Sequence, residues 1–232
     1  MIMENKSSGS RRILVVNPNT NAEITAGISK IASRILDRDC QSLVINPATG
    51  PRAIECKKDR EIAEPLVIDL VRQHSDYDAY VMACFDDIGV AGARNLVNAP
   101  VIDAVEASVS VARSYGSRYA ILTTVQDMVP GILTCLERLG ALEECTVKAA
   151  GVGVSSAAAA DMGTLARLDA TMAELCADTD VAAVILGSGG LAGQAKRLSE
   201  KYSIPVIDCI EAAIKLANTR SRKPYLEYES PE

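Results

Sequence analysis

The sequence predicts an α/β protein made of two similar, Rossmann-like lobes with parallel four-stranded sheets. Three observations predict it. Short β-branched segments alternate with amphipathic helical segments, loops rich in Asn, Pro and Gly follow the predicted strands, and the second half of the chain repeats the first. With 232 residues, of which 48% are hydrophobic, the chain is long enough to bury a substantial core.

The first lobe begins with a predicted strand at residues 13–16, which leads into the segment Asn17-Pro18-Asn19-Thr20-Asn21. Asn and Thr side chains in this segment can cap the helix that follows, whose isoleucines recur at helical spacing. The next elements are a strand, a helix and a strand at residues 42–46, 61–73 and 79–83. The last strand carries Cys84 into a strand-to-helix loop, and open α/β sheets bind ligands at such loops.

The second lobe follows the same order of elements. Strands are predicted at residues 118–122, 146–150 and 181–186, and helices at residues 127–139 and 165–176. Thr123 and Thr124 form the loop after the first of these strands, and Gly187-Ser188-Gly189-Gly190 forms the loop after the last. These two loops are therefore further candidates for ligand contact.

An internal repeat relates the two halves. The segment DAYVMACFDDIG aligns with AAVILGSGGLAG, which pairs Cys84 with Ser188, and APVIDAVEASVSVA aligns with IPVIDCIEAAIKLA, which pairs Asp103 with Asp208. Two such lobes are expected to face each other across a ligand cleft, with Cys84 and Ser188 on opposite walls. We divide the chain into one lobe of residues 1–102 plus 209–232 and a second lobe of residues 103–208.

Composition excludes several classes of partner. The net charge is −6, aromatic residues make up only 3% and Trp is absent, so no basic or stacking surface for nucleic acid is expected. The N-terminal segment is polar and no apolar run reaches about 20 residues, which argues against a membrane protein. Seven cysteines without a CxxC pair, and a single histidine, leave few plausible ligands for a zinc site. We expect a cytoplasmic homo-oligomer that binds a small-molecule substrate.

Cys84 is the strongest catalytic candidate. A thiol has a pKa near 8.5, which a helix N-terminus can lower, and Cys84 lies where a strand gives way to a helix. Most unpaired cysteines are buried and inert, but the loop position and the repeat partner favour a function here. Asp86 and Asp87 are expected to cap the following helix, and their charge would oppose formation of the thiolate.

Polar side chains in the equivalent loops are candidates for substrate binding. Asn17, Asn19, Thr123 and Thr124 offer amide and hydroxyl donors suited to a carboxylate or imide oxygen. The same side chains often cap helices, and one residue can do both.

Cofactor-dependent and hydrolytic chemistry fit the sequence less well. Residues 187–192 match G-x-G-x-x-A with Asp208 about 20 residues further on. However, this loop lies in the last third of the chain, Asp208 has a repeat twin, and the first strand leads to NPNTN instead of glycines. G-x-S-x-G is not matched around Ser188, and no lysine for pyridoxal phosphate lies in the candidate loops. We therefore expect no cofactor.

Several segments together carry a family resemblance: ILVVNPNTN, DAYVMACFDDIG, the Thr123-Thr124 loop, AAVILGSGG and IPVIDCIEAA. They resemble hydantoin and allantoin racemases of the aspartate/glutamate racemase superfamily, over about residues 12–218. The ACFDD segment is specific to the hydantoin branch. NPNT and the PVID segments are shared with maleate isomerases and arylmalonate decarboxylases.

The resemblance implies two lobes related by a pseudo-twofold axis, with two cysteines facing the substrate from opposite sides and no metal or organic cofactor. Cys84 matches the first cysteine, but Ser188 stands where the family has the second. A serine hydroxyl is a much weaker acid than a thiol, so two-base racemisation should be impaired. Ser188 is either an engineered inactivating substitution, which the intact surrounding loops favour, or natural in an enzyme with a one-sided reaction such as decarboxylation. The related decarboxylases keep the second cysteine instead of the first, which weakens that alternative.

We predict a cofactor-independent racemase in ureide metabolism that acts at C5 of allantoin or a 5-substituted hydantoin. Cys84 would serve one face and position 188 the other. The carbonyl oxygens would contact Asn17, Asn19, Thr123, Thr124 and the N–H groups near Phe85 and Gly189, while Gly189 and Gly190 allow close approach of the backbone. The alternatives are another racemase, isomerase or decarboxylase of the superfamily acting on amino acids or dicarboxylates, or a ureide-binding protein without catalysis. The segment 219–232 is expected to be a solvated end or a subunit contact.

Overall fold

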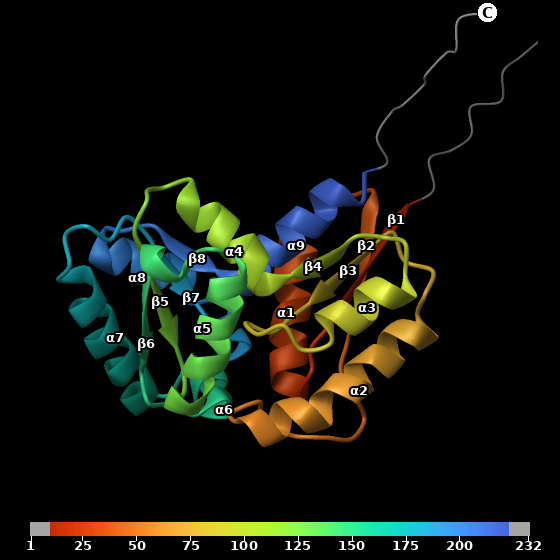
Figure 1. Cartoon of the computed structure of the whole chain (residues 1–232), viewed down its shortest axis with the longest axis horizontal. Helices are drawn as coiled ribbons and strands as arrows, with labels where there is room; N and C mark the ends of the chain where they lie inside the picture. Colours follow the sequence, from red (N-terminus) through yellow and green to blue (C-terminus); the bar gives the residue numbers. More distant parts are fainter. Residues whose placement is uncertain (1–9, 223–232) are drawn as a thin grey trace, which may run out of the picture.

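The computed structural model describes residues 10–222, in which two parallel four-stranded sheets lie side by side (Figure 1). The strands of the first sheet, in spatial order, are β2 (Cys40–Ile45), β1 (Arg11–Val16), β3 (Ala79–Met82) and β4 (Val101–Asp103). Those of the second are β6 (Cys145–Ala149), β5 (Tyr119–Thr123), β7 (Val184–Leu186) and β8 (Val206–Asp208). The two sheets thus have the same strand order, which confirms the predicted fold class and the two equivalent lobes.

Helices cover both faces of each sheet. The helices around the first sheet are α1 (Ala22–Ile35), α2 (Lys57–Gln73), α3 (Val90–Leu96) and α9 (Cys209–Arg220). Those around the second are α4 (Ala104–Arg113), α5 (Val129–Arg138), α6 (Val154–Ala159), α7 (Met162–Cys176) and α8 (Ala195–Tyr202). Short 3-10 helices occupy Gln126–Met128, Leu142–Glu144 and Gly189–Leu191.

The central strands are apolar throughout because both of their faces are covered. In β1, Ile13 and Val15 pack into a core that contains residues of α1 and α9, whereas Leu14 and Val16 pack into a core with residues of α2 and α3. Successive side chains of a strand point to opposite faces, so an uninterrupted apolar run serves two cores. The first of these cores continues into the second lobe and joins the two sheets.

The last strand of each sheet leads into a helix that packs on the other lobe. Helix α4 follows β4 of the first sheet but contacts β7 and β8, while α9 follows β8 and contacts β3 and β4. Asp103 and Asp208 cap these helices through their carboxylates. The lobe division at residues 102 and 209 remains a prediction, and its ends, residues 1–9 and 223–232, lie outside the described residues. Most of the predicted tail segment 219–232 lies there too.

Some element ends differ from the sequence prediction. Helix α2 begins at Lys57 instead of residue 61. The sequence does not reveal this first turn because it is charged and shows no apolar periodicity. In the structure, the Asp59 carboxylate accepts from the N–H of Glu55 just before the helix. Strand β7 begins at Val184 instead of residue 181, since its pairing with β5 and β8 starts there.

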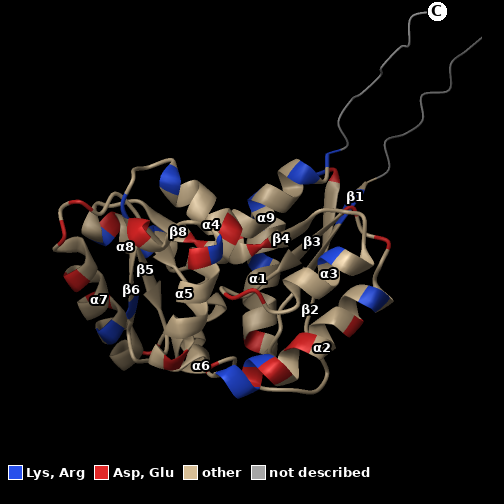
Figure 2. Ribbon diagram, in the orientation of Figure 1, with Lys and Arg blue, Asp and Glu red and all other residues tan. Residues whose placement is uncertain are grey.

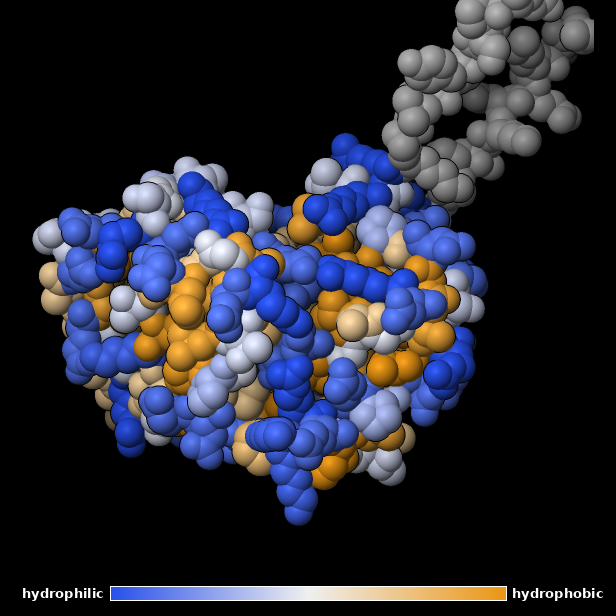
Figure 3. All heavy atoms as spheres, viewed as in Figure 1, coloured by the Kyte–Doolittle hydropathy of each residue, from blue (hydrophilic) through white to orange (hydrophobic). Residues whose placement is uncertain are grey.

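Charged side chains lie mainly on the outer helices and loops (Figure 2). The visible face is largely hydrophilic, with apolar patches between the charged residues (Figure 3). Among the described residues, no helix combines the length and apolarity that crossing a membrane requires.

Candidate functional site

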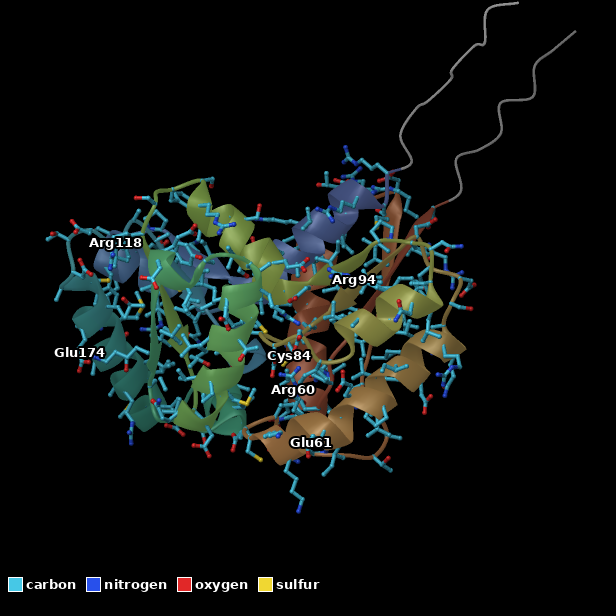
Figure 4. The ribbon with its side chains drawn as sticks, viewed as in Figure 1. Arg60, Glu61, Cys84, Arg94, Arg118 and Glu174 are labelled. Atoms are coloured by element: carbon cyan, nitrogen blue, oxygen red, sulfur yellow. The ribbon has the colours of Figure 1, made fainter. Side chains whose placement is uncertain are left out.

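A small cavity of about 30 Å³ lies between the two lobes, at the carboxyl ends of their central strands. Seven of the nine site residues predicted from the sequence line it: Asn19, Cys84, Phe85, Thr123, Thr124, Ser188 and Gly189. Figure 4 shows Cys84 in the centre of the molecule between the lobes, whereas Arg118 and Glu174 lie on its outer side. The lining therefore unites loops that are up to about 170 residues apart in the chain.

Cys84 and Ser188 reach the cavity from equivalent positions. Each is the second residue after a central strand, β3 in one lobe and β7 in the other. The two loops are in contact: a Cβ on Gly187 would lie 2.9 Å from Cδ1 of Phe85, and one on Gly189 would lie 3.6 Å from the carbonyl oxygen of Ala83. The structure thus brings a thiol and a hydroxyl to one cavity from two lobes, as the repeat predicts.

Asn17 and Asn19 have different roles. Asn17 is buried and does not line the cavity, and its Nδ2 donates to Oδ1 of Asn19 at 3.1 Å. Oδ1 of Asn19 also accepts from the N–H of Asn21 at 2.9 Å, and Asn21 caps α1. With its oxygen held in this way, Asn19 presents its amide nitrogen, for which we find no acceptor among residues 10–222. Asn17 therefore orients Asn19 and does not reach the cavity itself. Of the two residues, Asn19 is the one placed to contact a ligand.

Three hydroxyl groups form the wall contributed by the second lobe. Thr123 donates to the carbonyl oxygen of Gly187 at 2.9 Å, which fixes β5 to the loop after β7. The Thr124 hydroxyl donates to Oγ of Ser188 at 3.4 Å, and the N–H of Gly190 donates to the same oxygen at 3.3 Å. Because the Ser188 oxygen accepts both bonds, its own proton is available to a ligand in the cavity.

Two backbone N–H groups of cavity residues have no partner within residues 10–222. Among the described residues, we find no acceptor for the N–H of Phe85 or of Gly189. They come from the equivalent loops that carry Cys84 and Ser188. Unpaired N–H donors in a buried position stabilise an oxygen that gains negative charge during a reaction.

The electrostatic environment of Cys84 contradicts the expectation of a lowered pKa. Burial raises the pKa of the Cys84 thiol well above its ordinary value, and the nearby Asp86 raises it further, while Arg60 lowers it in part. Helix α3 begins only at Val90, so no helix N-terminus follows Cys84 directly. The thiol is therefore protonated at neutral pH in this closed arrangement of the cavity.

Asp86 and Asp87 do not cap α3, because Gly89 is the residue before that helix and no side chain caps it. Arg60 donates to Oδ1 of Asp86 at 2.8 Å and also bonds Asp87, which pairs with Arg138 of α5 as well. Burial raises the pKa of Asp86 to about 6. Although carboxylate oxygens of both residues and Sγ of Cys135 lie within 4.8 Å of one another, the guanidinium groups already compensate the charge, so we assign an ion-pair role.

The structure adds cavity residues that the sequence prediction missed. Five of them have apolar side chains: Ile54, Ala83, Met128, Ile132 and Val154. None carries a chemical signal in the sequence, because an apolar residue near a loop usually indicates core packing. The lining of the cavity therefore combines polar groups with apolar side chains.

The alternative of a dinucleotide site is not supported by the geometry. The turn at residues 189–191 is a single 3-10 turn capped by Ser188, and the next α-helix begins at Ala195. The Asp208 carboxylate accepts from the N–H groups of Gly193, Ile210 and Glu211, so it is not available to a ribose hydroxyl.

Comparison with known proteins identifies similar chains. The family described as Asp/Glu/Hydantoin racemase matches residues 13–217. A hydantoin racemase from Rhizobium meliloti is 33% identical over 209 residues, which cover 88% of this chain and 86% of that protein. The structure of an allantoin racemase from Klebsiella pneumoniae has a TM-score of 0.86 at 29% identity and covers 90% of this chain and 87% of that one. An allantoin racemase from Pseudomonas fluorescens has a TM-score of 0.79 at 28% identity, with 90% and 89% covered.

Proposed function

Because this chain belongs to the Asp/Glu/hydantoin racemase family of isomerases, we propose that it acts on a cyclic ureide, either allantoin or a 5-substituted hydantoin. The observation that carries the proposal is the shared cavity, in which a thiol from one lobe faces donors from both. Proton exchange at C5 would take place there without a metal or organic cofactor.

The donors around the cavity suit the carbonyl oxygens of a ureide ring. Asn19 offers its amide nitrogen, Phe85 and Gly189 offer backbone N–H groups, and the Ser188 hydroxyl can donate because Thr124 donates to its oxygen. Removal of the C5 proton places negative charge on the adjacent carbonyl oxygen. Donors that are already in position lower the free energy of that enolate without further reorganisation.

Cys84 and Ser188 divide the proton transfer unequally. Racemisation needs one group that removes the C5 proton and another that returns a proton to the opposite face. Cys84 can do either, depending on its protonation state. The Ser188 hydroxyl is too weak an acid and too poor a base to match it. We therefore propose that this protein exchanges the proton of one enantiomer with retention and racemises slowly.

The test is proton NMR of each enantiomer of allantoin and of a 5-alkyl hydantoin in heavy water, with optical rotation followed in parallel and background exchange subtracted. The proteins are the unmodified chain, Ser188→Cys, Cys84→Ser, and Cys176→Ser as a matched control, because Cys176 lies in α7 and does not line the cavity.

We expect C5 deuteration of one enantiomer by the unmodified chain and racemisation by Ser188→Cys. Cys84→Ser should lose exchange, whereas Cys176→Ser should keep it. Absence of exchange in both the unmodified chain and Ser188→Cys would refute the enzymatic proposal. Saturable ureide binding without exchange would instead indicate a binding protein, an alternative that the hydroxyl at position 188 favours. Homo-oligomerisation and a cytoplasmic location stay predictions.

A further inference from the structure

A hydrogen bond connects the two lobes beside the cavity. Residues 46–56 connect β2 to α2, and near their end Oε1 of Glu55 accepts from the N–H of Val154 in the second lobe at 2.6 Å. In Figure 1 the beginning of α2 reaches α6 across the lower edge of the space between the lobes. We call residues 52–55 the strap.

The bond joins residues that border the cavity. Ile54, next to Glu55, is buried and lines the cavity, and Val154 lines it from the other lobe. Val154 also packs against the Ser188 loop, since a Cβ on Gly190 would lie only 2.5 Å from its carbonyl oxygen. The carboxylate of Glu55 therefore connects the strap to the segment that supports Ser188.

The closed cavity is too small for the proposed substrate. A cavity needs roughly 10–15 Å³ to hold one water molecule, so this cavity of about 30 Å³ holds only a few atoms. A hydantoin ring with its two carbonyl oxygens has seven non-hydrogen atoms. A wall of the cavity must move for such a ligand to enter.

The strap is held by few hydrogen bonds. We find no backbone hydrogen bond made by residues 52–54 to any part of the chain from residue 10 to residue 222. On its N-terminal side the chain is fixed, because the N–H of Thr20 donates to the carbonyl oxygen of Pro51 at 2.9 Å. On its C-terminal side the N–H of Glu55 donates to Asp59 in the first turn of α2. The opposite wall is held more firmly, by β5 and the Thr123 bond to Gly187.

We propose that Glu55 is a positioning residue whose carboxylate, by accepting the N–H of Val154, holds the strap closed over the cavity and releases it to admit ligand. The closed strap excludes water from Cys84 and sets the spacing of the two loops. Its role in turnover rests on the proposed function, but the closure itself does not depend on which molecule binds.

The first experiment measures access to Cys84 without any substrate. The protein is pulsed with iodoacetamide at one pH, and alkylation of each cysteine is followed by peptide mass spectrometry in the unmodified chain, Glu55→Ala, Glu55→Gln and Glu143→Gln. Glu143 is exposed, and we find no hydrogen bond of its side chain to residues 10–222, so its variant is a charge-matched control. Cys176 is the internal reference because it lies outside the cavity.

A hydrogen bond to a charged acceptor shifts an equilibrium about tenfold or more. We expect alkylation of Cys84 in Glu55→Ala to be about tenfold faster than in the unmodified chain, with Cys176 unchanged. Glu55→Gln, which keeps an acceptor, should restore most of the protection. An unchanged Cys84 rate in Glu55→Ala overturns the proposal, and so does an equal acceleration at Cys176, which would indicate general unfolding.

The second experiment uses C5 deuteration in the Ser188→Cys background. Adding Glu55→Ala should raise the apparent KM about tenfold because the closed state is less populated, while Glu143→Gln changes neither KM nor kcat. An unchanged KM overturns the role in turnover. If no ureide is exchanged by any variant, the proposed function fails while the alkylation result still decides whether Glu55 closes the strap.

Discussion

Replacing Gly190 by alanine provides a direct test of how the Ser188 loop is packed. A Cβ at this position would lie 2.5 Å from the carbonyl oxygen and 3.1 Å from Cγ1 of Val154. The first distance is to backbone, so α6 or the Ser188 loop has to shift. Overpacking of this kind costs about 1–3 kcal/mol. For a chain of this size, each kcal/mol lowers the midpoint of thermal unfolding by roughly 2–4 °C, so we expect a decrease of about 2–12 °C.

Gly189→Ala is the matched control. Its Cβ would lie 3.6 Å from the carbonyl oxygen of Ala83, an ordinary contact, and neither glycine has a positive φ that would strain an alanine. The midpoint of this variant should therefore fall within about 2 °C of the unmodified chain. The assay is thermal unfolding followed by far-UV circular dichroism for the three proteins. Equal midpoints for the two variants would refute the inference that Gly190 alone is required by close backbone approach.

Three further predictions concern pH and specificity. Burial raises the pKa of Asp103 to about 7, whereas the unfolded chain loses this proton near 3.9, so its contribution to stability is full below about pH 4 and is lost as pH rises through about 7. Between about pH 5 and about pH 8, the unmodified chain should therefore lose roughly 2–4 kcal/mol of its free energy of unfolding through Asp103, and Asp103→Asn should not show this loss. Urea titration of both proteins at the two pH values measures it, and an equal loss in both would contradict the assignment. Because burial raises the pKa of Cys84, C5 exchange should increase about tenfold per pH unit between about pH 6 and about pH 9, and a plateau that begins at about pH 8.5 would show an ordinary thiol. Met128→Ala shortens a side chain that lines the cavity, so the ratio of kcat/KM for a bulky 5-alkyl hydantoin to that for 5-methylhydantoin should rise about threefold or more. An unchanged ratio would show that the 5-substituent does not contact Met128.

Local patterns account for the parts of the fold and site that could be predicted. The apolar run at residues 13–16 and the alternation of strand and helix segments predict buried parallel strands, because side-chain direction follows the backbone period. The repeat pairs Cys84 with Ser188, and the equal strand orders bring both to the same cavity between the lobes. Asn21 as a helix cap also follows from local geometry.

Contacts between distant segments decided the rest. The Cys84 pKa is raised instead of lowered because burial outweighs any local helix effect, and burial depends on both lobes. Asp86 and Asp87 pair with Arg60 of α2 and Arg138 of α5, which no local capping pattern reveals.

The sequence by itself determined the two-lobed architecture and the pair of residues at the centre of the site, since periodicity and an internal repeat are properties of the chain alone. Only the tertiary structure decided that Asn17 supports Asn19 instead of lining the cavity, that Gly190 and not Gly189 needs to lack a side chain, and that Glu55 contacts Val154. The physical reason is that burial, charge environment and contact between lobes depend on how distant segments pack, and no local pattern specifies the distance in space between residues such as Glu55 and Val154.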